Sequence, residues 1–401
     1  MASLHTAASL ARLGTESAFE VLARAQALQA QGKSIISLSI GQPDFPTPPH
    51  IVEAAVKALR DGHHGYTAAN GIPQLRQAVS EDIERRLNVT VDPKRIVVVP
   101  GGKVTMFFAI ALFGEPGAEI LYPDPGFPIY RSVIDYVGAK AVPVHLKESE
   151  GFAFSAERAL SLITPRTRLV IFNTPANPTG GVTPKEELDK LVEGLLRHPQ
   201  VAVMADEIYG QMLYDGLKHQ SLLSYPEIQD RLILLDGWSK TYAMTGWRMG
   251  FGVWPEKLAE AATRLAINVH SCVNAAAQWA GIAALKGPQD EVHKMVAAFD
   301  DRRRYIHERL NQLPGVSCIR PAGAFYAFPN ITKTGFKSKE LEGRLLDDVG
   351  VATISGTSFG VHGEGYLRLS YANSKENIGL ALDRVGGFLK AAAPAKAQAL
   401  A

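Results

Sequence analysis

A lysine and an arginine stand in an apolar, glycine-rich stretch in the second half of the chain. Residues 237–252 read GWSKTYAMTGWRMGFG, so Lys240 and Arg248 have aromatic residues, methionines and glycines as neighbours. Charged side chains are rarely buried without a partner, and a desolvated lysine amine can attack a carbonyl carbon. We therefore take this stretch as a candidate site of covalent chemistry, to be weighed against a lysine that only keeps the surface soluble.

Other chemically useful groups follow predicted strands. Because the carboxyl ends of parallel strands meet at one edge of a sheet, groups that follow several strands are expected to converge on one crevice. A glycine pair before a helix, an acidic strand end and an asparagine in a proline-rich loop each have an ordinary structural explanation when taken alone. Together they supply amides and an arginine for a phosphate, a carboxylate for a ring nitrogen, donors for a ring oxygen and an amine for an aldehyde. Pyridoxal 5'-phosphate needs these groups. The segments are Gly101 to Lys103, Asn173 to Gly180 (NTPANPTG), Asp206 to Tyr209 (DEIY) and Lys240.

Short apolar runs rich in β-branched residues predict the sheet that positions these groups. Such runs are typical of strands buried on both faces of a mostly parallel sheet. Amphipathic segments between several of them predict helices on both faces, so the fold class is α/β. In one helix, PKEELDKLVEGLLRH, Thr183 is expected as the N-cap and Pro184 as a first-turn proline. The predicted strands are 95–100, 118–123, 141–146, 167–173, 201–207, 231–237 and 249–254.

A long helical pattern separates this part of the chain from its C-terminal residues. Residues 289–313 predict a connecting helix, and the strand-like and helical segments after it predict a smaller α+β lobe. We therefore divide the chain into an N-terminal segment, residues 1–45, a large domain, residues 46–288, and a connecting helix with a small C-terminal domain, residues 289–401.

Length and charge favour a protein that acts on small molecules. The 401 residues contain 42 Lys and Arg against 40 Asp and Glu, which leaves no excess basic charge to attract nucleic acid. Two distant cysteines, Cys272 and Cys318, exclude a disulfide framework and a cysteine-rich zinc site, and no metal site is expected. There is neither a secretory signal nor an apolar run of about 18 residues, so we expect a cytoplasmic protein without a membrane span.

Several motifs, in order, resemble those of the class I (fold-type I) pyridoxal-phosphate-dependent aminotransferases, close to the bacterial aspartate-aminotransferase-like subgroup. The pattern around the lysine is long and specific, because Gly237, Ser239, Lys240, Arg248 and Gly250 all hold the family's positions. GQPDFPTP, YTAANGIPQLRQAV, PGGKVTMFF, NPTG, DEIY and PAGAFYAFPNI occur in the family's order, and the resemblance extends over about residues 41–372. It implies a large cofactor-binding domain with a mostly parallel seven-stranded sheet flanked by helices. It also implies a smaller α+β domain, formed by the N-terminal segment and the C-terminal part.

The resemblance implies a role for each residue around the cofactor. Lys240 would hold the cofactor aldehyde covalently and then move a proton between substrate and cofactor as general base and acid. Asp206 would keep the pyridine nitrogen protonated, and Arg248 would bind the phosphate. The other expected cofactor contacts are Gly102, Lys103 and Ser239 at the phosphate, Asn177 and Tyr209 at the ring 3'-oxygen, and Phe127 stacked over the ring.

The same resemblance implies the substrate contacts and a shared site. Arg368 in YLRLSYA would bind the substrate α-carboxylate, because a planar guanidinium pairs both oxygens. Gly41 would offer its backbone to the same end of the substrate, and Asn177 is also expected there. Tyr66 in YTAANG would reach the phosphate of the neighbouring subunit. A homodimer with shared active sites is therefore expected.

Substrate preference is expected to depend on Lys103 and Phe127. In the resembling subgroup the lysine of GGK also meets the distal carboxylate of an acidic substrate, which favours aspartate or glutamate with 2-oxoglutarate or oxaloacetate. Phe127 stands where aspartate aminotransferases have a tryptophan whose N–H serves that carboxylate, and phenylalanine has no donor. We therefore expect a ping-pong aminotransferase that prefers dicarboxylic substrates and tolerates aromatic or aliphatic amino acids.

One alternative stays open and another is disfavoured. A lyase or a cyclopropane-carboxylate synthase of the same fold would use the same cofactor residues, so the motifs around Lys240 do not exclude it. Some transcription regulators carry an aminotransferase-like module as a ligand sensor, together with an N-terminal DNA-binding domain. The 40 residues before GQPDF are too few for that domain and a linker, so we expect an enzyme.

Overall fold

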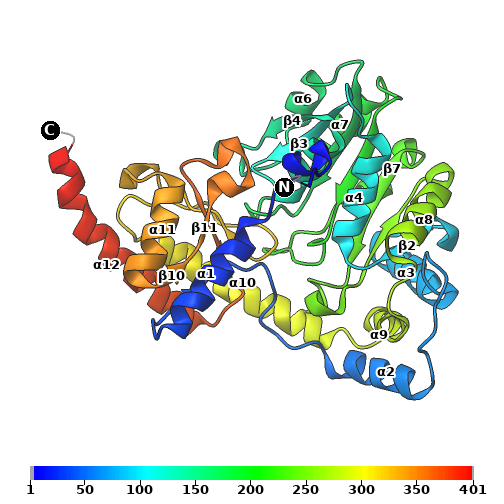
Figure 1. The fold of residues 1–401 in the computed structure, drawn as a ribbon, viewed down its shortest axis with the longest axis horizontal. Coiled ribbons are helices and arrows are strands. Elements are labelled where there is room, and N and C mark those ends of the chain that lie inside the picture. The colour runs from blue at the N-terminus through cyan, green and yellow to red at the C-terminus, as the bar shows by residue number, and fades with distance from the viewer. Residues whose placement is uncertain (1–3, 400–401) are drawn as a thin grey trace.

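A seven-stranded sheet forms the centre of the larger of two lobes (Figure 1). The structure is a computed structural model that describes residues 4–399, with side chains for residues 4–392, so the ends of the two terminal segments lie outside it. All strands are parallel except β8, which is antiparallel to both of its neighbours. The predicted mostly parallel seven-stranded sheet is confirmed. In spatial order the strands are β2 (Ile96–Val99), β8 (Gly250–Val253), β7 (Leu232–Gly237), β6 (Ala202–Asp206), β5 (Thr167–Asn173), β3 (Glu119–Asp124) and β4 (Lys140–His145).

Alternating side chains of the sheet pack into two separate apolar cores. On β2, Val98 belongs to one core, whereas Val97 and Val99 belong to the other. Helices α2, α3, α6, α7 and α9 contribute to the first core and α4, α5 and α8 to the second, so both faces are covered. Because both faces are apolar, polar side chains are left to the strand ends. These helices are α2 (Pro49–Arg60), α3 (Pro73–Leu87), α4 (Gly102–Phe113), α5 (Pro128–Val137), α6 (Ala156–Ser161), α7 (Lys185–Leu195), α8 (Glu256–His270) and α9 (Ala275–Lys286).

The register of the sheet brings the polar strand ends together. Asn173 ends β5 and is paired with Asp206, which ends β6. Lys240 follows the end of the neighbouring strand β7, and Gly102 opens α4 directly after β2. The expectation that these strand ends converge is therefore confirmed.

Helix α10 (Asp290–Leu310) occupies most of the predicted helical run 289–313 and leads from the larger lobe into the smaller one (Figure 1). The smaller lobe contains a three-stranded antiparallel sheet in the order β11-β12-β9. The N-terminal segment is tied to the C-terminal part because β1 pairs in parallel with β10. The elements of the smaller lobe are α1 (Ser17–Ala30), β1 (Ile36–Ser37), β9 (Tyr326–Ala327), α11 (Ser338–Val349), β10 (Val351–Ala352), β11 (Ile354–Ser355), β12 (Leu367–Ser370) and α12 (Lys375–Ala399).

The predicted start of helix α7 is wrong. The helix begins at Lys185 with Pro184 at the N-cap, and no side chain caps it. Thr183 is buried, and its hydroxyl oxygen accepts a hydrogen bond from the backbone N–H of Phe154 at 3.1 Å. A long-range contact therefore uses the oxygen that was expected to cap the helix.

Short 3-10 helices join many of these elements. The 3-10 helices are η1 (Ala8–Arg12), η2 (Pro93–Arg95), η3 (Glu148–Glu150), η4 (Leu222–Ser224), η5 (Pro226–Ile228), η6 (Thr245–Trp247), η7 (Thr332–Thr334), η8 (Gly356–Phe359) and η9 (Val361–Gly363).

Within residues 4–399, no helix combines the length and the apolar composition needed to cross a membrane.

Candidate active site

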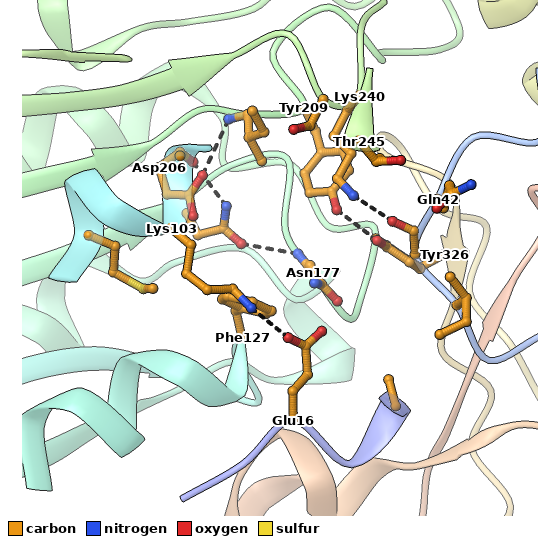
Figure 2. A pocket seen from close by; sticks show the side chains of 18 of the residues that line it. Glu16, Gln42, Lys103, Phe127, Asn177, Asp206, Tyr209, Lys240, Thr245 and Tyr326 are labelled. Carbon is orange, nitrogen blue, oxygen red and sulfur yellow. Dashed lines mark hydrogen bonds and ion pairs between the residues drawn. The ribbon is translucent and has the colours of Figure 1, made fainter. Parts of the chain in front are cut away.

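A cavity of about 590 Å³ lies at the carboxyl ends of β5, β6 and β7, and residues of both lobes line it (Figure 2). This volume is in the range of small-molecule binding sites. The structure brings into this one cavity every site residue predicted from the sequence except Tyr66. These residues are Gly41, Gly102, Lys103, Phe127, Asn177, Asp206, Tyr209, Ser239, Lys240, Arg248 and Arg368.

The amine of Lys240 is held inside the cavity without a carboxylate partner among the described residues. Its Nζ donates a hydrogen bond to the backbone carbonyl of Gly41 and lies 5.9 Å from the ring centroid of Phe325. Burial lowers the pKa of Lys240 to about 8, against the opposing effect of Glu16. At pH 7 about a tenth of the amine is therefore uncharged, far more than in an exposed lysine, and a nucleophile or general base requires this uncharged form.

Asp206 is a buried carboxylate at the end of β6. It accepts a hydrogen bond from the hydroxyl of Tyr130 at 2.6 Å and another from the backbone N–H of Ile208 at 3.3 Å. Burial raises its pKa to about 6, and the Tyr130 hydrogen bond opposes this rise. A cationic group beside Asp206 would replace the lost hydration and favour the charged carboxylate.

A chain of hydrogen bonds connects the end of β5 to Arg368 on β12. The side-chain oxygen of Asn173 accepts a hydrogen bond from the backbone N–H of Asn177 at 3.0 Å. The side-chain oxygen of Asn177 in turn accepts one from Arg368 Nη1 at 3.1 Å. The Arg368 side chain is buried, but within the described part of the chain it forms no ion pair and its Nε has no hydrogen-bond partner. It is therefore a desolvated cation with bonding capacity left for an anion.

The first turn of α4 and Arg248 form a second anion site. Gly101, the N-cap residue of α4, has a φ of 92°, and a Cβ at this position would lie 2.1 Å from Arg248 Nη2. A glycine here therefore lets the guanidinium approach the helix N-terminus. Arg248 Nη1 is held by the carbonyl of Thr245 at 2.8 Å, and buried Ser239 lines the same cavity. Free amides at a helix N-terminus together with a guanidinium suit a phosphate.

Two buried tyrosines close the cavity on the side of Gly41. The hydroxyls of Tyr209 and Tyr326 share a hydrogen bond of 2.7 Å (Figure 2). A Cβ on Gly41 would lie 2.2 Å from the Tyr326 hydroxyl oxygen, so only glycine allows this close approach. Gly41 thus combines a steric role with its carbonyl contact to Lys240.

Lys103 forms an ion pair at the outer end of the cavity. Its Nζ lies 2.8 Å from a carboxylate oxygen of Glu16, which precedes α1. The Lys103 Nζ also lies 5.3 Å from the ring centroid of Phe127, a contact of cation–π type. Figure 2 shows Glu16 reaching Lys103 and Phe127 from the side opposite Asp206 and Tyr209.

Tyr66 does not belong to the cavity of its own chain. Its side chain is 92% exposed, which is unusual for a large aromatic residue. Its predicted contact with a neighbouring subunit stays a prediction.

Sequence reasoning missed several residues that line the cavity. Tyr130 stands three positions after Phe127, in the segment PDPGFPIY, and Tyr326 lies in the motif PAGAFYAFPNI. Both are therefore close in sequence to residues that were predicted in the site or to a motif that was quoted. Glu16 and Phe19 come from the N-terminal segment, where no motif marks them. Only the folded chain brings this segment to the strand ends.

Comparisons with known proteins agree with this geometry. The model of the family described as aminotransferase class I and II matches residues 33–385. An aspartate aminotransferase of Geobacillus stearothermophilus is 35% identical over 390 residues, which cover 96% of this chain and 98% of the relative. Aromatic-amino-acid aminotransferase 2 of Thermococcus litoralis is 37% identical over 365 residues, covering 90% of this chain and 93% of the relative. The solved structure of an aspartate aminotransferase from Rhizobium meliloti has a TM-score of 0.92 and 32% identity, covering 97% of this chain and 99% of that one.

Proposed function

Because the chain belongs to the class I and II aminotransferases, which depend on pyridoxal 5'-phosphate, we propose that the cavity around Lys240 is its active site. There it moves the amino group of an L-amino acid to a 2-oxo acid in two half-reactions. The observation that carries the proposal is that a lysine with a pKa of about 8 shares one cavity with two separate anion sites and a buried carboxylate.

The residues of the cavity fit pyridoxal 5'-phosphate. Arg248, Ser239 and the first amides of α4 at Gly102 and Lys103 supply donors for the phosphate, in a cradle that a Cβ on Gly101 would fill. Buried Asp206 would hold the protonated ring nitrogen. Burial raises the pKa of Asp206 to about 6, and the positive charge of the ring nitrogen would favour its carboxylate form. The remaining expected contacts are Asn177 and Tyr209 at the ring 3'-oxygen and Phe127 against the ring face.

The chain's own residues then position the substrate and move its proton. When bound, the cofactor supplies an aldehyde that takes up the amino group and an electron-poor ring that stabilises negative charge beside the α-carbon. Arg368 binds the substrate α-carboxylate, and Asn177 holds the guanidinium in place. The Lys240 amine accepts the proton of the substrate α-carbon as general base. As general acid it delivers this proton to the carbon of the cofactor aldehyde group.

For the substrates, we propose a dicarboxylic amino acid and its 2-oxo acid as one pair, with aromatic or aliphatic amino acids as alternative donors. Lys103 supplies the cation for a distal carboxylate, and Phe127 supplies an apolar surface without a donor. The relatives include proteins named for aspartate and for aromatic amino acids, which supports the pairing of the two classes.

We further propose a homodimer, with Tyr66 as the residue that enters the partner's site. Tyr66 is 92% exposed in its own chain, and a large aromatic residue with this exposure is expected to be covered by a partner. This supports the assignment. The cytoplasmic location stays a prediction from the sequence.

The visible spectrum of the purified protein tests the proposed activity. Adding a panel of amino acids should convert the bound cofactor to its aminated form with one equivalent of 2-oxo acid, and a second 2-oxo acid should reverse the change. Release of ammonia in place of that conversion would identify a lyase and contradict the proposal.

A further inference from the structure

The outer end of the cavity carries a neutralised charge. The cations that line the whole cavity are Lys103, Lys240, Arg248 and Arg368, and the carboxylates are Glu16 and Asp206. Under the proposed function the cofactor phosphate satisfies Arg248, the ring nitrogen satisfies Asp206 and the substrate α-carboxylate satisfies Arg368. Lys240 reacts. The pair of Lys103 and Glu16 is therefore what a substrate side chain meets.

The Glu16 carboxylate is not needed by the helix that it precedes. Glu16 is the N-cap residue of α1, a position where the shorter side chains of Ser, Thr, Asp or Asn commonly accept a hydrogen bond from the first turn. In this chain it makes no such capping bond and points instead to Lys103 Nζ at 2.8 Å. Turning the carboxylate away from Lys103 would therefore break one ion pair but no capping hydrogen bond.

The pair is also open enough for exchange. The side chains of Lys103 and Glu16 are 44% and 19% exposed, so water reaches the ammonium group and the pair is only partly desolvated. Exposed and partly exposed ion pairs are weak, and an incoming carboxylate could replace Glu16 at Lys103 with little net cost.

Aromatic rings flank the same ammonium group. The Lys103 Nζ lies 5.3 Å from the ring centroid of Phe127 and 6.0 Å from that of Phe19, the residue that follows Glu16 by three positions in α1. When Glu16 neutralises Lys103, these rings present an apolar surface to an uncharged substrate side chain. When Glu16 leaves, the same place presents a cation.

We propose that Glu16 is an internal counter-ion that competes with the distal carboxylate of the substrate for Lys103 and so determines specificity. It stays on Lys103 when the substrate side chain is uncharged and is displaced when the side chain carries a carboxylate. One cavity thereby accepts both classes in the two half-reactions. The inference rests on the proposed function and adds a specificity-determining residue to it.

Binding of two amine-free analogues tests the inference without turnover. Succinate and 3-phenylpropanoate each have one carboxylate for Arg368, and they differ in whether the distal end is charged or apolar. Isothermal titration calorimetry on the cofactor-loaded protein measures both dissociation constants. In Glu16→Gln we expect the succinate affinity to rise about three- to tenfold. The affinity for 3-phenylpropanoate should stay within about twofold or fall, because Lys103 is then left unneutralised beside the apolar end.

Two further variants separate this role from a general charge effect. Glu20→Gln removes the same charge from an exposed residue of α1 that does not line the cavity, and it should leave both affinities unchanged. In a Lys103→Gln background the Glu16→Gln change should no longer alter the succinate affinity. Circular dichroism and the cofactor spectrum check that each variant is folded and loaded.

Three outcomes would overturn the inference. They are an unchanged or weaker succinate affinity in Glu16→Gln, an equal gain in Glu20→Gln, and a gain that persists without Lys103. Each is a difference in binding between loaded variants, and it is scored only once the unsubstituted protein has been shown to transfer amino groups. Each therefore refutes the role of Glu16 and leaves the proposed function standing. Absence of amino transfer with every donor would instead refute the proposed function.

Discussion

At the scale of single residues, the reactivity of Lys240 depends on what surrounds its amine in space. The lysine follows a strand, but the carbonyl that holds its amine belongs to Gly41 in the N-terminal segment. Burial is the main cause of its lowered pKa, and the nearby cations Arg368, Arg248 and Lys103 act in the same direction. A lysine on an open surface would keep its proton at neutral pH.

The lowered pKa predicts how cofactor uptake depends on pH. The amine must be uncharged to attack an aldehyde, so the uptake rate of cofactor-free protein should rise about tenfold per pH unit and level off above about pH 8. Stopped-flow absorbance measures this rate, and Nα-acetyl-lysine under the same conditions corrects for titration of the cofactor itself. A rate that still rises tenfold between about pH 9 and pH 10 would show an ordinary lysine.

Arg368 should determine how tightly the α-carboxylate binds. Arg368→Gln removes the positive charge and one of two charge-assisted hydrogen bonds, because the glutamine amide can keep the other. One such bond contributes about 1.5–3 kcal/mol, so kcat/KM for the amino donor should fall about 10- to 150-fold, mainly through KM. Steady-state kinetics with saturating 2-oxo acid measure this. The control is Arg60→Gln, the same chemical change at an exposed position of α2. Equal kinetics in the two variants would exclude Arg368 from substrate binding.

The residues of the cavity that hold family motif positions were predicted from the sequence. Those whose role depends on a contact with a residue far away in the sequence were missed. Lys240, Asp206 and Arg368 were each expected in the site, although their roles there stay predictions. Glu16 was not expected, because it meets Lys103 across 87 positions of sequence and no spacing rule connects the two. Tyr130 was missed because a tyrosine in a helix gives no indication that its hydroxyl will meet a buried carboxylate.

At the scale of secondary-structure elements, the turn between β2 and α4 carries the anion site that we propose for the cofactor phosphate. The residue there must accept a left-handed backbone and also leave space for a guanidinium. Glycine meets both demands, because it has no Cβ. The turn therefore couples the start of a helix to the position of Arg248.

Substituting this glycine should separate backbone strain from loss of the site. Gly101→Ala combines a φ of 92° with a Cβ 2.1 Å from Arg248 Nη2, so we expect both a loss of about 1–2 kcal/mol in the free energy of unfolding and at least about a tenfold weaker cofactor affinity. Gly117→Ala is the matched control, since it has a φ of 93° but no atom within 4 Å of the added Cβ. It should lose stability only. Urea unfolding and cofactor titration measure the two quantities, and equal cofactor affinity in the two variants would contradict the role of this turn.

The positions of strands were predictable where burial on both faces of the sheet requires a continuous apolar run. The predicted strand 167–173 and the observed β5 coincide, because a continuous apolar run suits a strand covered by helices on both sides. The antiparallel direction of β8 could not be predicted in the same way, since a buried strand has the same composition in either direction. The Thr183 cap failed because Phe154, which is distant in sequence, uses its oxygen.

At the scale of the whole molecule, the N-terminal segment completes a cavity that is built mainly on the larger lobe. Its strand β1 is anchored to β10 through the pair Ile36 and Val351. Figure 1 shows helix α1 of the same segment beside the smaller lobe, and Glu16 and Gly41 line the cavity. The divisions at residues 45 and 288 stay predictions. The assembly of two such molecules would add Tyr66, which its own chain leaves exposed.

A mixing experiment tests whether two subunits share each site. Tyr66→Ala and Lys240→Ala should each be impaired alone. In a mixed dimer, one site would combine an intact Lys240 with an intact Tyr66 from the other subunit. Unfolding and refolding an equimolar mixture should therefore restore activity to about a quarter of the unsubstituted protein. Activity no higher than the mean of the separate variants would place Tyr66 outside the neighbouring site.

The most direct test of the proposed site identifies the lysine that binds the cofactor. The loaded protein is reduced with borohydride, digested and mapped by mass spectrometry, and the Lys240→Ala variant is treated in parallel. We predict the cofactor mass on the peptide that contains Lys240, with neither label nor amino transfer in the variant. A label on another lysine, such as Lys103, or undiminished amino transfer by Lys240→Ala would contradict the assignment of Lys240.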